Sequence, residues 1–187
     1  MASGTYFTDQ FLIAMPNMSD PRFQQTVTYV CEHDEDGALG IVINRPLELK
    51  LGEVLAQMSL DTSDDDLCKQ PIVYGGPVQQ DRGFVLHDPT VSWDSTLSVS
   101  PDVGLTTSRD ILASMAGGDG PTPALVALGY AGWDAGQLDR EMASNAWLSV
   151  PANTDIIFRT PFEKRWEAAV ALLGIDLDRL SDQAGHA

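Results

Sequence analysis

Residues 26–46 read TVTYVCEHDEDGALGIVINRP, a stretch that combines strand periodicity, turn residues and a second apolar alternation. In its first part Val27, Tyr29 and Cys31 recur at every second position, which is the period of a β-strand, and β-branched and aromatic side chains dominate. The polar run HDEDG at 33–37 then ends on a glycine, a residue that tolerates positive φ. Apolar alternation resumes at Leu39 and stops at Pro46. The stretch therefore predicts a β-hairpin.

Short apolar runs and amphipathic segments follow one another along the rest of the chain. Further strands are predicted at residues 11–15, 72–74, 83–87, 91–100, 124–131 and 147–150. Helices are predicted at 50–58, from the capping box at 107–110 to the glycines at 117–118, after 132–133, and from Pro161 to Gly174, with a short helical turn in the tail at 177–187. The acidic run DTSDDD at 61–66 is predicted to be a solvated loop, and residues 153–158 show no clear preference.

This order of elements predicts an α+β fold, because strands and helices do not alternate as in a doubly wound sheet. We expect a single domain over residues 1–187, since the chain is long enough for one core and no linker-like segment interrupts it. The sheet should be mixed, mainly antiparallel and strongly bent by the glycines at 75, 76 and 83, with helices flanking it.

Acidic residues dominate the charge: 27 Asp and Glu against 11 Lys and Arg give a formal charge of −16. Such a charge repels phosphate backbones and anionic membranes, so direct DNA binding is disfavoured, and the pair Lys164–Arg165 is thin support for a basic patch. The two cysteines do not form a disulfide framework, and Pro16 cuts short the apolar run at 11–15. We therefore expect a cytoplasmic protein without a membrane anchor.

Cys31 is the first candidate for chemistry. A thiol beside His33 at the end of a strand, or near His87, could act as a nucleophile in a hydrolase or transferase if an imidazole stabilised the thiolate. In a regular strand Cys31 and His33 would share a face, but that face is the core side, and the acidic neighbours oppose ionisation. A structural, semi-buried thiol and a redox- or electrophile-responsive thiol are the alternatives. Cys68 is expected to be an exposed bystander.

No metal site or cofactor is predicted. The three histidines, His33, His87 and His186, are scattered, and no HxH, HExxH or CxxC spacing occurs.

Gly75 and Gly76, followed by Arg82, form a second candidate. Free backbone N–H groups and a guanidinium could bind an anion or an oxyanion. The alternative is that the glycines simply shape a turn, since the pattern is neither a P-loop nor a dinucleotide fingerprint.

The predicted helix after Gly132-Trp133 supplies a third candidate. Gln137, Glu141 and Asn145 recur at four-residue steps, so they line one helix face, and Trp133 and Trp147 flank it. This face could recognise a partner or a ligand, or it could be a solvated stripe.

Five segments resemble those of the YqgE/AlgH family of bacterial proteins. They are FLIAMPNMSDPRF (11–23), the hairpin stretch (26–46), YGGPVQQDRGFVLH (74–87), LGYAGWDAGQLDREMASNAWL (128–148) and TPFEKRWEAAVALLGID (160–176) with the terminal GHA. The resemblance implies an α+β domain with a strongly bent sheet and a regulatory role, since AlgH-type members are described as regulators connected with alginate production in pseudomonads. It supplies no catalytic residues.

Three functional hypotheses follow. The first is a non-enzymatic cytoplasmic regulatory or interaction protein that acts through a protein partner and responds through Cys31. The second is a thiol-dependent hydrolase or transferase that uses Cys31 with His33 or His87. The third is a DNA-binding transcriptional regulator, which the charge of −16 disfavours. The sequence does not determine an oligomeric state.

Overall fold

The predicted hairpin is present, and it lies within one curled sheet. The computed structural model describes residues 6–15, 20–21 and 23–174. Its strands are β1 (Gln10–Ala14), β2 (Val27–Asp34), β3 (Gly37–Val42), β4 (Pro46–Lys50), β5 (Pro71–Tyr74), β6 (Val78–His87), β7 (Thr96–Ser98), β8 (Gly104–Thr106), β9 (Ala124–Asp134) and β10 (Trp147–Pro151). Its helices are α1 (Leu51–Gln57), α2 (Asp65–Cys68), α3 (Arg109–Ala116), α4 (Gln137–Ala143), α5 (Thr154–Phe158), the 3₁₀ turn η1 (Phe162–Lys164) and α6 (Arg165–Leu172).

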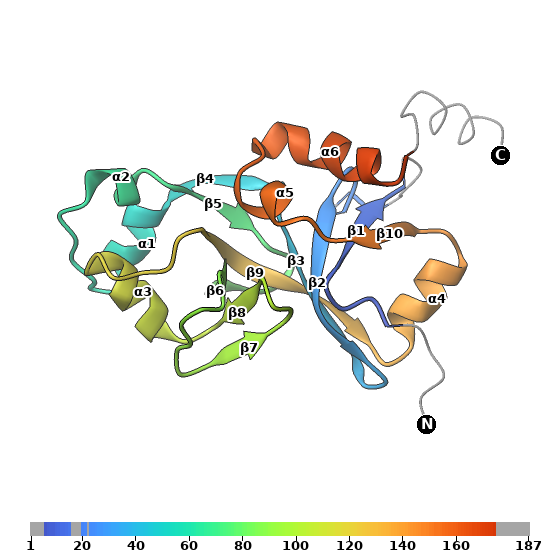
Figure 1. Ribbon diagram of the computed structural model, residues 1–187, viewed down its shortest axis with the longest axis horizontal. Helices are drawn as coiled ribbons and strands as arrows, with labels where there is room; N and C mark the ends of the chain where they lie inside the picture. The colour runs from blue at the N-terminus through green and yellow to red at the C-terminus, as the bar shows by residue number, and fades with distance from the viewer. Residues whose placement is uncertain (1–5, 16–19, 22, 175–187) are drawn as a thin grey trace.

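The strand β9 joins the two halves of the sheet. The strand order is β10-β1-β2-β3-β9-β6-β8-β7, with β5 on β9 and β4 on β5. The first part of β9 pairs with β6 and β5, and residues 131–134 pair with β3. Among the described strands only the β5–β9 pairing is parallel, so the predicted mixed, mainly antiparallel sheet is confirmed. Figure 1 shows β9 running from one half of the molecule to the other.

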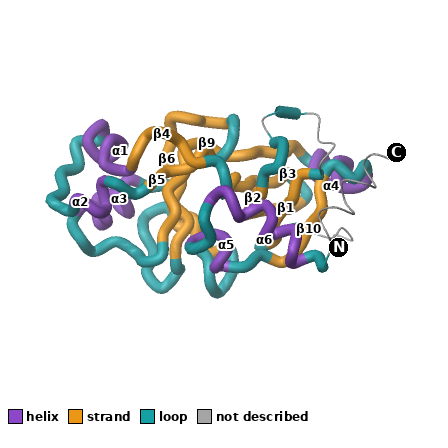
Figure 2. Tube along the Cα trace, turned by 90° about the horizontal axis from the view of Figure 1, so that it is seen from above, coloured by secondary structure: helices purple, strands orange, loops and turns teal. Residues whose placement is uncertain are grey.

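The helices bury three apolar clusters against the sheet. Helices α1, α2 and α3 gather at one end, where Leu51, Leu55 and Ile111 pack on β5, β6 and β9 (Figures 1 and 2). Helix α6 lies over β1 and β2, α5 packs against α6 and β9, and both helices close the largest cluster. Helix α4 packs Leu138 against Trp133 and Trp147 at the opposite end. All helices of the described chain are short, and none has the length and hydrophobicity of a membrane-spanning segment.

Three local predictions change. Residues 91–100 were predicted as one strand, but only β7 forms there, and Trp93 instead donates its indole N–H to Ser114 Oγ of α3 at 3.2 Å. The acidic run at 61–66 is not all loop, because the Asp64 carboxylate caps α2 by accepting the Leu67 N–H at 3.1 Å. Residues 153–158 contain α5, whose first N–H groups bond to the Asn153 side chain. The predicted turn at 177–187 lies outside the described residues.

Candidate functional site

Cys31 is a core residue. Its side chain is 1% exposed and lies in the largest apolar cluster with Val27 and Tyr29. Its thiol donates a weak hydrogen bond to the Tyr29 carbonyl oxygen, 3.8 Å from Sγ. Burial raises the pKa of Cys31 far above its ordinary value, and the charge of Glu32 adds to the effect. The thiol is therefore protonated at neutral pH.

His33 does not face Cys31, so the predicted shared face is wrong. A β-bulge between Val30 and Glu32 leaves Cys31 without a partner on β3 and reverses the alternation beyond it. His33 consequently pairs with Ala38, on the side of the α4 cluster. Its Nδ1 accepts the Phe7 N–H at 3.0 Å, and its Nε2 lies 3.7 Å from Asp139 Oδ2 of α4.

His87 is also unavailable to the thiol. Its Nδ1 lies 2.7 Å from the Asp88 carbonyl oxygen, which can only accept, so Nδ1 carries the proton. In the neutral ring Nε2 then accepts from the Thr106 hydroxyl at 2.6 Å. The ring is fully buried, and burial lowers its pKa. Both ring nitrogens thus have structural partners, and no thiol–imidazole pair forms with either histidine.

Gly75 and Gly76 allow two backbones to cross. A Cβ on Gly76 would lie 2.0 Å from the Tyr130 carbonyl carbon, and one on Gly75 would lie 2.3 Å from the Gly129 carbonyl oxygen. The Gly75 N–H donates to the Leu128 carbonyl at 2.8 Å, so it is not free to bind an anion. Arg82 lies apart from this crossing, on the rim of a cavity that neither glycine lines. The structure therefore does not assemble the predicted anion site.

The polar face of α4 is largely occupied within the molecule. Glu141 accepts three hydrogen bonds, from Trp133 Nε1 at 3.1 Å, Trp147 Nε1 at 2.9 Å and Gln137 Nε2 at 2.8 Å. Gln137 in turn accepts the Asp134 N–H at 2.9 Å. Asn145 is exposed just past the end of α4, with a φ of 63°. These hydrogen bonds hold α4 against β9 and β10. Of the predicted polar face, Gln137, Glu141 and Asn145, only Asn145 is therefore freely accessible.

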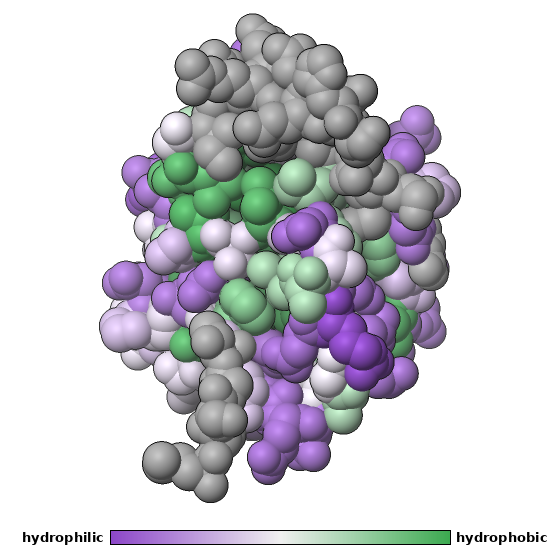
Figure 3. All heavy atoms as spheres, turned by 90° about the vertical axis from the view of Figure 1, so that its right-hand side faces the viewer, coloured by the Kyte–Doolittle hydropathy of each residue, from purple (hydrophilic) through white to green (hydrophobic). Residues whose placement is uncertain are grey.

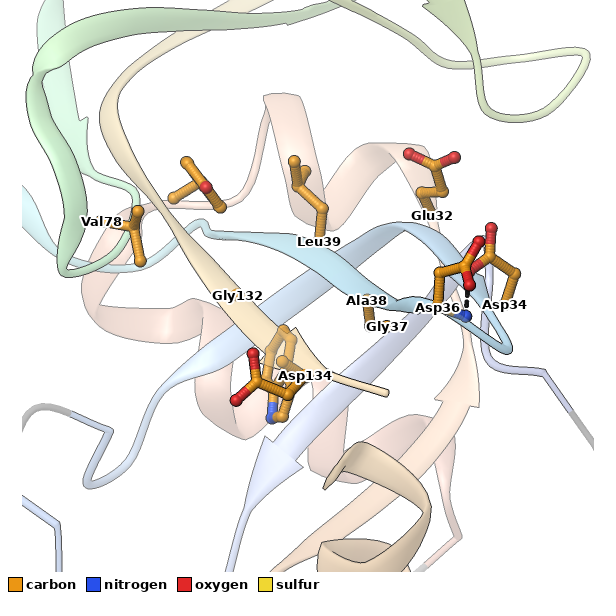
Figure 4. Close-up of a pocket in the computed structure, with 11 residues that line it drawn as sticks. Glu32, Asp34, Asp36, Gly37, Ala38, Leu39, Val78, Gly132 and Asp134 are labelled. Carbon is orange, nitrogen blue, oxygen red and sulfur yellow. Dashed lines mark hydrogen bonds between the residues drawn. The ribbon is translucent and has the colours of Figure 1, made fainter. Parts of the chain in front are cut away.

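An acidic groove that the sequence analysis missed lies where β2 and β3 extend beyond the end of β6. It has a volume of about 580 Å³. Figure 4 shows the lining side chains gathered over the hairpin and the end of β9. They are Glu32, Asp34, Asp36, Gly37, Ala38, Leu39, Val78, Tyr130, Gly132, Trp133 and Asp134.

Four carboxylates surround this groove, and within the described chain none of them forms an ion pair. Asp34 accepts the Asp36 N–H at 2.8 Å. The Tyr130 ring packs edge-on against Phe84, with centroids 5.4 Å apart, so its position is held by the core. Figure 3 views the molecule from the right-hand side of Figure 1, and the lower part of this face is largely hydrophilic. The β2–β3 turn lies at the same height in Figure 1.

Metal-ligating side chains do not cluster in the described part of the chain. No group of three or more His, Cys, Asp or Glu side chains there could hold a metal ion. The groove combines unpaired negative charge with apolar and aromatic side chains, which suits a cationic side chain better than a bare ion.

Basic surface for nucleic acid is correspondingly scarce. Arg165 of the Lys164–Arg165 pair is 3% exposed; its Nη1 donates to the Ile43 carbonyl at 2.7 Å and its Nε to the Thr160 carbonyl at 2.8 Å. Burial lowers the pKa of Arg165 to about 10, so it stays charged at neutral pH, over the Phe162 ring. Arg165 therefore ties α6 to the residue that follows β3, and only Lys164 of the pair is exposed.

A curled, mixed sheet flanked by short helices defines a small α+β domain, here with an acidic groove and, among the described residues, no thiol–histidine dyad. The chain belongs to the AlgH-like family, whose model matches residues 11–178.

Relatives of similar length support this assignment. UPF0301 proteins of Nitrosococcus oceani and Thioalkalivibrio sulfidiphilus are 52% and 56% identical over 187 residues, which is all of each chain. The solution structure of AlgH from Pseudomonas aeruginosa is 52% identical with a TM-score of 0.82, covering 100% of this chain and 99% of that one. A Corynebacterium diphtheriae protein, 18% identical with a TM-score of 0.68 over 90% of this chain and 87% of that one, shares the fold.

Proposed function

We propose that this protein is a non-enzymatic, cytoplasmic interaction protein that binds a basic segment of a protein partner in the acidic groove. The observation that carries the proposal is the groove itself, with its four unpaired carboxylates around Leu39 and Tyr130. An Arg or Lys side chain could meet carboxylates at the rim and the face of Tyr130 within.

The charge of the whole chain supports this choice of partner. A formal charge of −16 attracts basic surfaces over long range and accelerates their encounter. The same charge opposes DNA, and the burial of Arg165 removes half of the closest basic pair. Regulation through a protein partner therefore fits the electrostatics better than operator binding does.

The hydrolase or transferase alternative lacks a nucleophile. Cys31 is buried and protonated, and neither His33 nor His87 has a nitrogen directed at it. The same burial argues against Cys31 as a sensor of oxidants or electrophiles in the folded state, since such thiols are accessible and of low pKa.

Partner capture with charge-reversed variants tests the proposal. The groove variant is Glu32→Lys with Asp36→Lys, and the matched control is Glu48→Lys with Asp61→Lys. Each pair exchanges one exposed Glu and one exposed Asp, so the net charge changes equally, and neither control residue lines the groove. Tagged proteins would be incubated with extract of the native host, and retained proteins identified by mass spectrometry.

We expect a partner that the wild-type protein and the control retain and the groove variant loses. Its binding should also weaken as salt is raised, because exposed charge pairs are screened. Equal retention by all three proteins would place the contact elsewhere, and retention of no partner by the wild-type protein would remove the proposal.

A further inference from the structure

A second cavity lies at the end of the molecule where α1 and α3 pack on the sheet. It has a volume of about 350 Å³ and opens between β4 and α1 on one side and β6 and α3 on the other. Apolar side chains make most of its wall: Leu49, Val54, Met58, Val85, Leu112 and Leu128. This size and lining are typical of sites for small organic molecules, which have volumes of about 300–1,000 Å³.

Two arginines stand at the mouth of this cavity. Arg82 is carried by a bulge of β6, where Val78 pairs with Tyr130 and Gly83 with Leu128, so residues 79–82 loop out of the ladder. Arg109 is the first residue of α3, whose N-terminus adds positive potential at the same rim.

Both guanidinium groups keep donors free. Arg82 Nη1 donates to Gln79 Oε1 at 3.3 Å, and Arg109 Nη2 donates to the Met58 carbonyl at 2.9 Å. Neither arginine is in an ion pair with a carboxylate of the described residues. Two of only 11 basic residues thus flank one apolar cavity in a strongly acidic chain.

We infer that this cavity binds a small amphipathic anion, with its apolar part among the leucines and its oxyanion on Arg82 and Arg109. Guanidinium groups bind carboxylate and phosphate oxygens through paired N–H donors, so both headgroups share the required chemistry. Asp81 also lines the cavity, and its negative charge would oppose the anion. The site is separate from the acidic groove, and neither proposal depends on the other.

The test is an NMR titration of the ¹⁵N-labelled full chain with octanoate, octyl phosphate and 1-octanol. Saturable shifts at the amides of Gly83 and Arg109 are expected for the anions. Octanol should bind at least about tenfold more weakly, because it lacks the charge-assisted hydrogen bonds. Tighter binding of octanoate assigns a carboxylate headgroup, and tighter binding of octyl phosphate assigns a phosphate.

Substitutions separate the two parts of the site. Arg82→Gln should weaken octanoate by about tenfold, whereas Asp81→Asn should strengthen it. Gly83→Leu should abolish binding by filling the cavity, because a Cβ there meets only Leu112 Cδ1, at 3.8 Å. Gly132→Leu, which fills the acidic groove instead, should leave octanoate binding intact.

Three results would overturn the inference. The first is equal affinity for octanoate and octanol, and the second is no saturable binding of any probe. The third is unchanged octanoate binding in Arg82→Gln, a substitution of an exposed side chain that leaves the packing of the core unchanged.

Discussion

Glu141 should contribute far more to stability than a partly exposed glutamate ordinarily does. Its carboxylate is the hydrogen-bond acceptor for the indoles of Trp133 and Trp147, which are only 7% and 3% exposed, and for the Gln137 amide. In Glu141→Ala both buried indole N–H groups lose their partner. At about 1–3 kcal/mol for each unsatisfied buried donor, the free energy of unfolding should fall by about 2–6 kcal/mol.

The assay is urea unfolding followed by circular dichroism, with the m-value checked for two-state behaviour. Glu141→Gln retains an oxygen for the indoles and should lose about 1 kcal/mol or less. Glu163→Ala, an exposed site on η1, is the control and should change stability by less than about 0.5 kcal/mol. If Glu141→Ala were as stable as this control, the hydrogen bonds of Glu141 would not stabilise the fold. A role of the α4 face in binding a partner would then be the better explanation of its polar residues.

Three further predictions concern the core and the strand crossing. Iodoacetamide should label Cys68 in the folded protein and Cys31 only as fast as the chain unfolds, because Cys31 is buried and its pKa is raised; equal labelling rates would contradict this. Because burial depresses the pKa of His87 in the folded state, the unfolded chain binds its proton more readily, and stability should fall as the pH drops below about 6.5. Chemical denaturation between pH 7.5 and 5 should show a flatter profile for His87→Gln, and an identical slope would refute the assignment. Gly76→Ala should prevent folding or strongly lower the melting temperature, since its Cβ would meet the β9 backbone at 2.0 Å, whereas Gly117→Ala, with contacts of 3.5 Å or more, should be tolerated.

Local periodicity was enough to predict most strands and the helices α1, α3, α4 and α6. The hairpin at 26–46 could be predicted because its alternation and its glycine turn lie within one short stretch. The bulge at Cys31 could not, since it depends on how β2 registers against β3, and a single extra residue moved His33 to the other face.

The functional surfaces depend on contacts between distant parts of the chain. The groove joins the acidic residues of the hairpin turn to Tyr130 and Gly132 of β9, and nothing local in either segment indicates that they meet. The sequence did contain a clue to the hydrogen bonds of Glu141. Buried indoles need an acceptor, and two tryptophans flank the helix. The four-residue spacing alone did not distinguish a partner face from this internal network.

The affinity of the captured partner for Gly132→Leu shows whether the acidic groove is the partner site. A side chain at 132 would enter the groove, because its Cβ meets only side-chain atoms, Tyr130 Cε2 at 3.2 Å being the nearest. Measured by calorimetry on folded protein, the variant should bind the partner at least about tenfold more weakly than the wild type, since a filled groove excludes the anchoring side chain. Unchanged affinity would contradict the assignment of the acidic groove as the partner site.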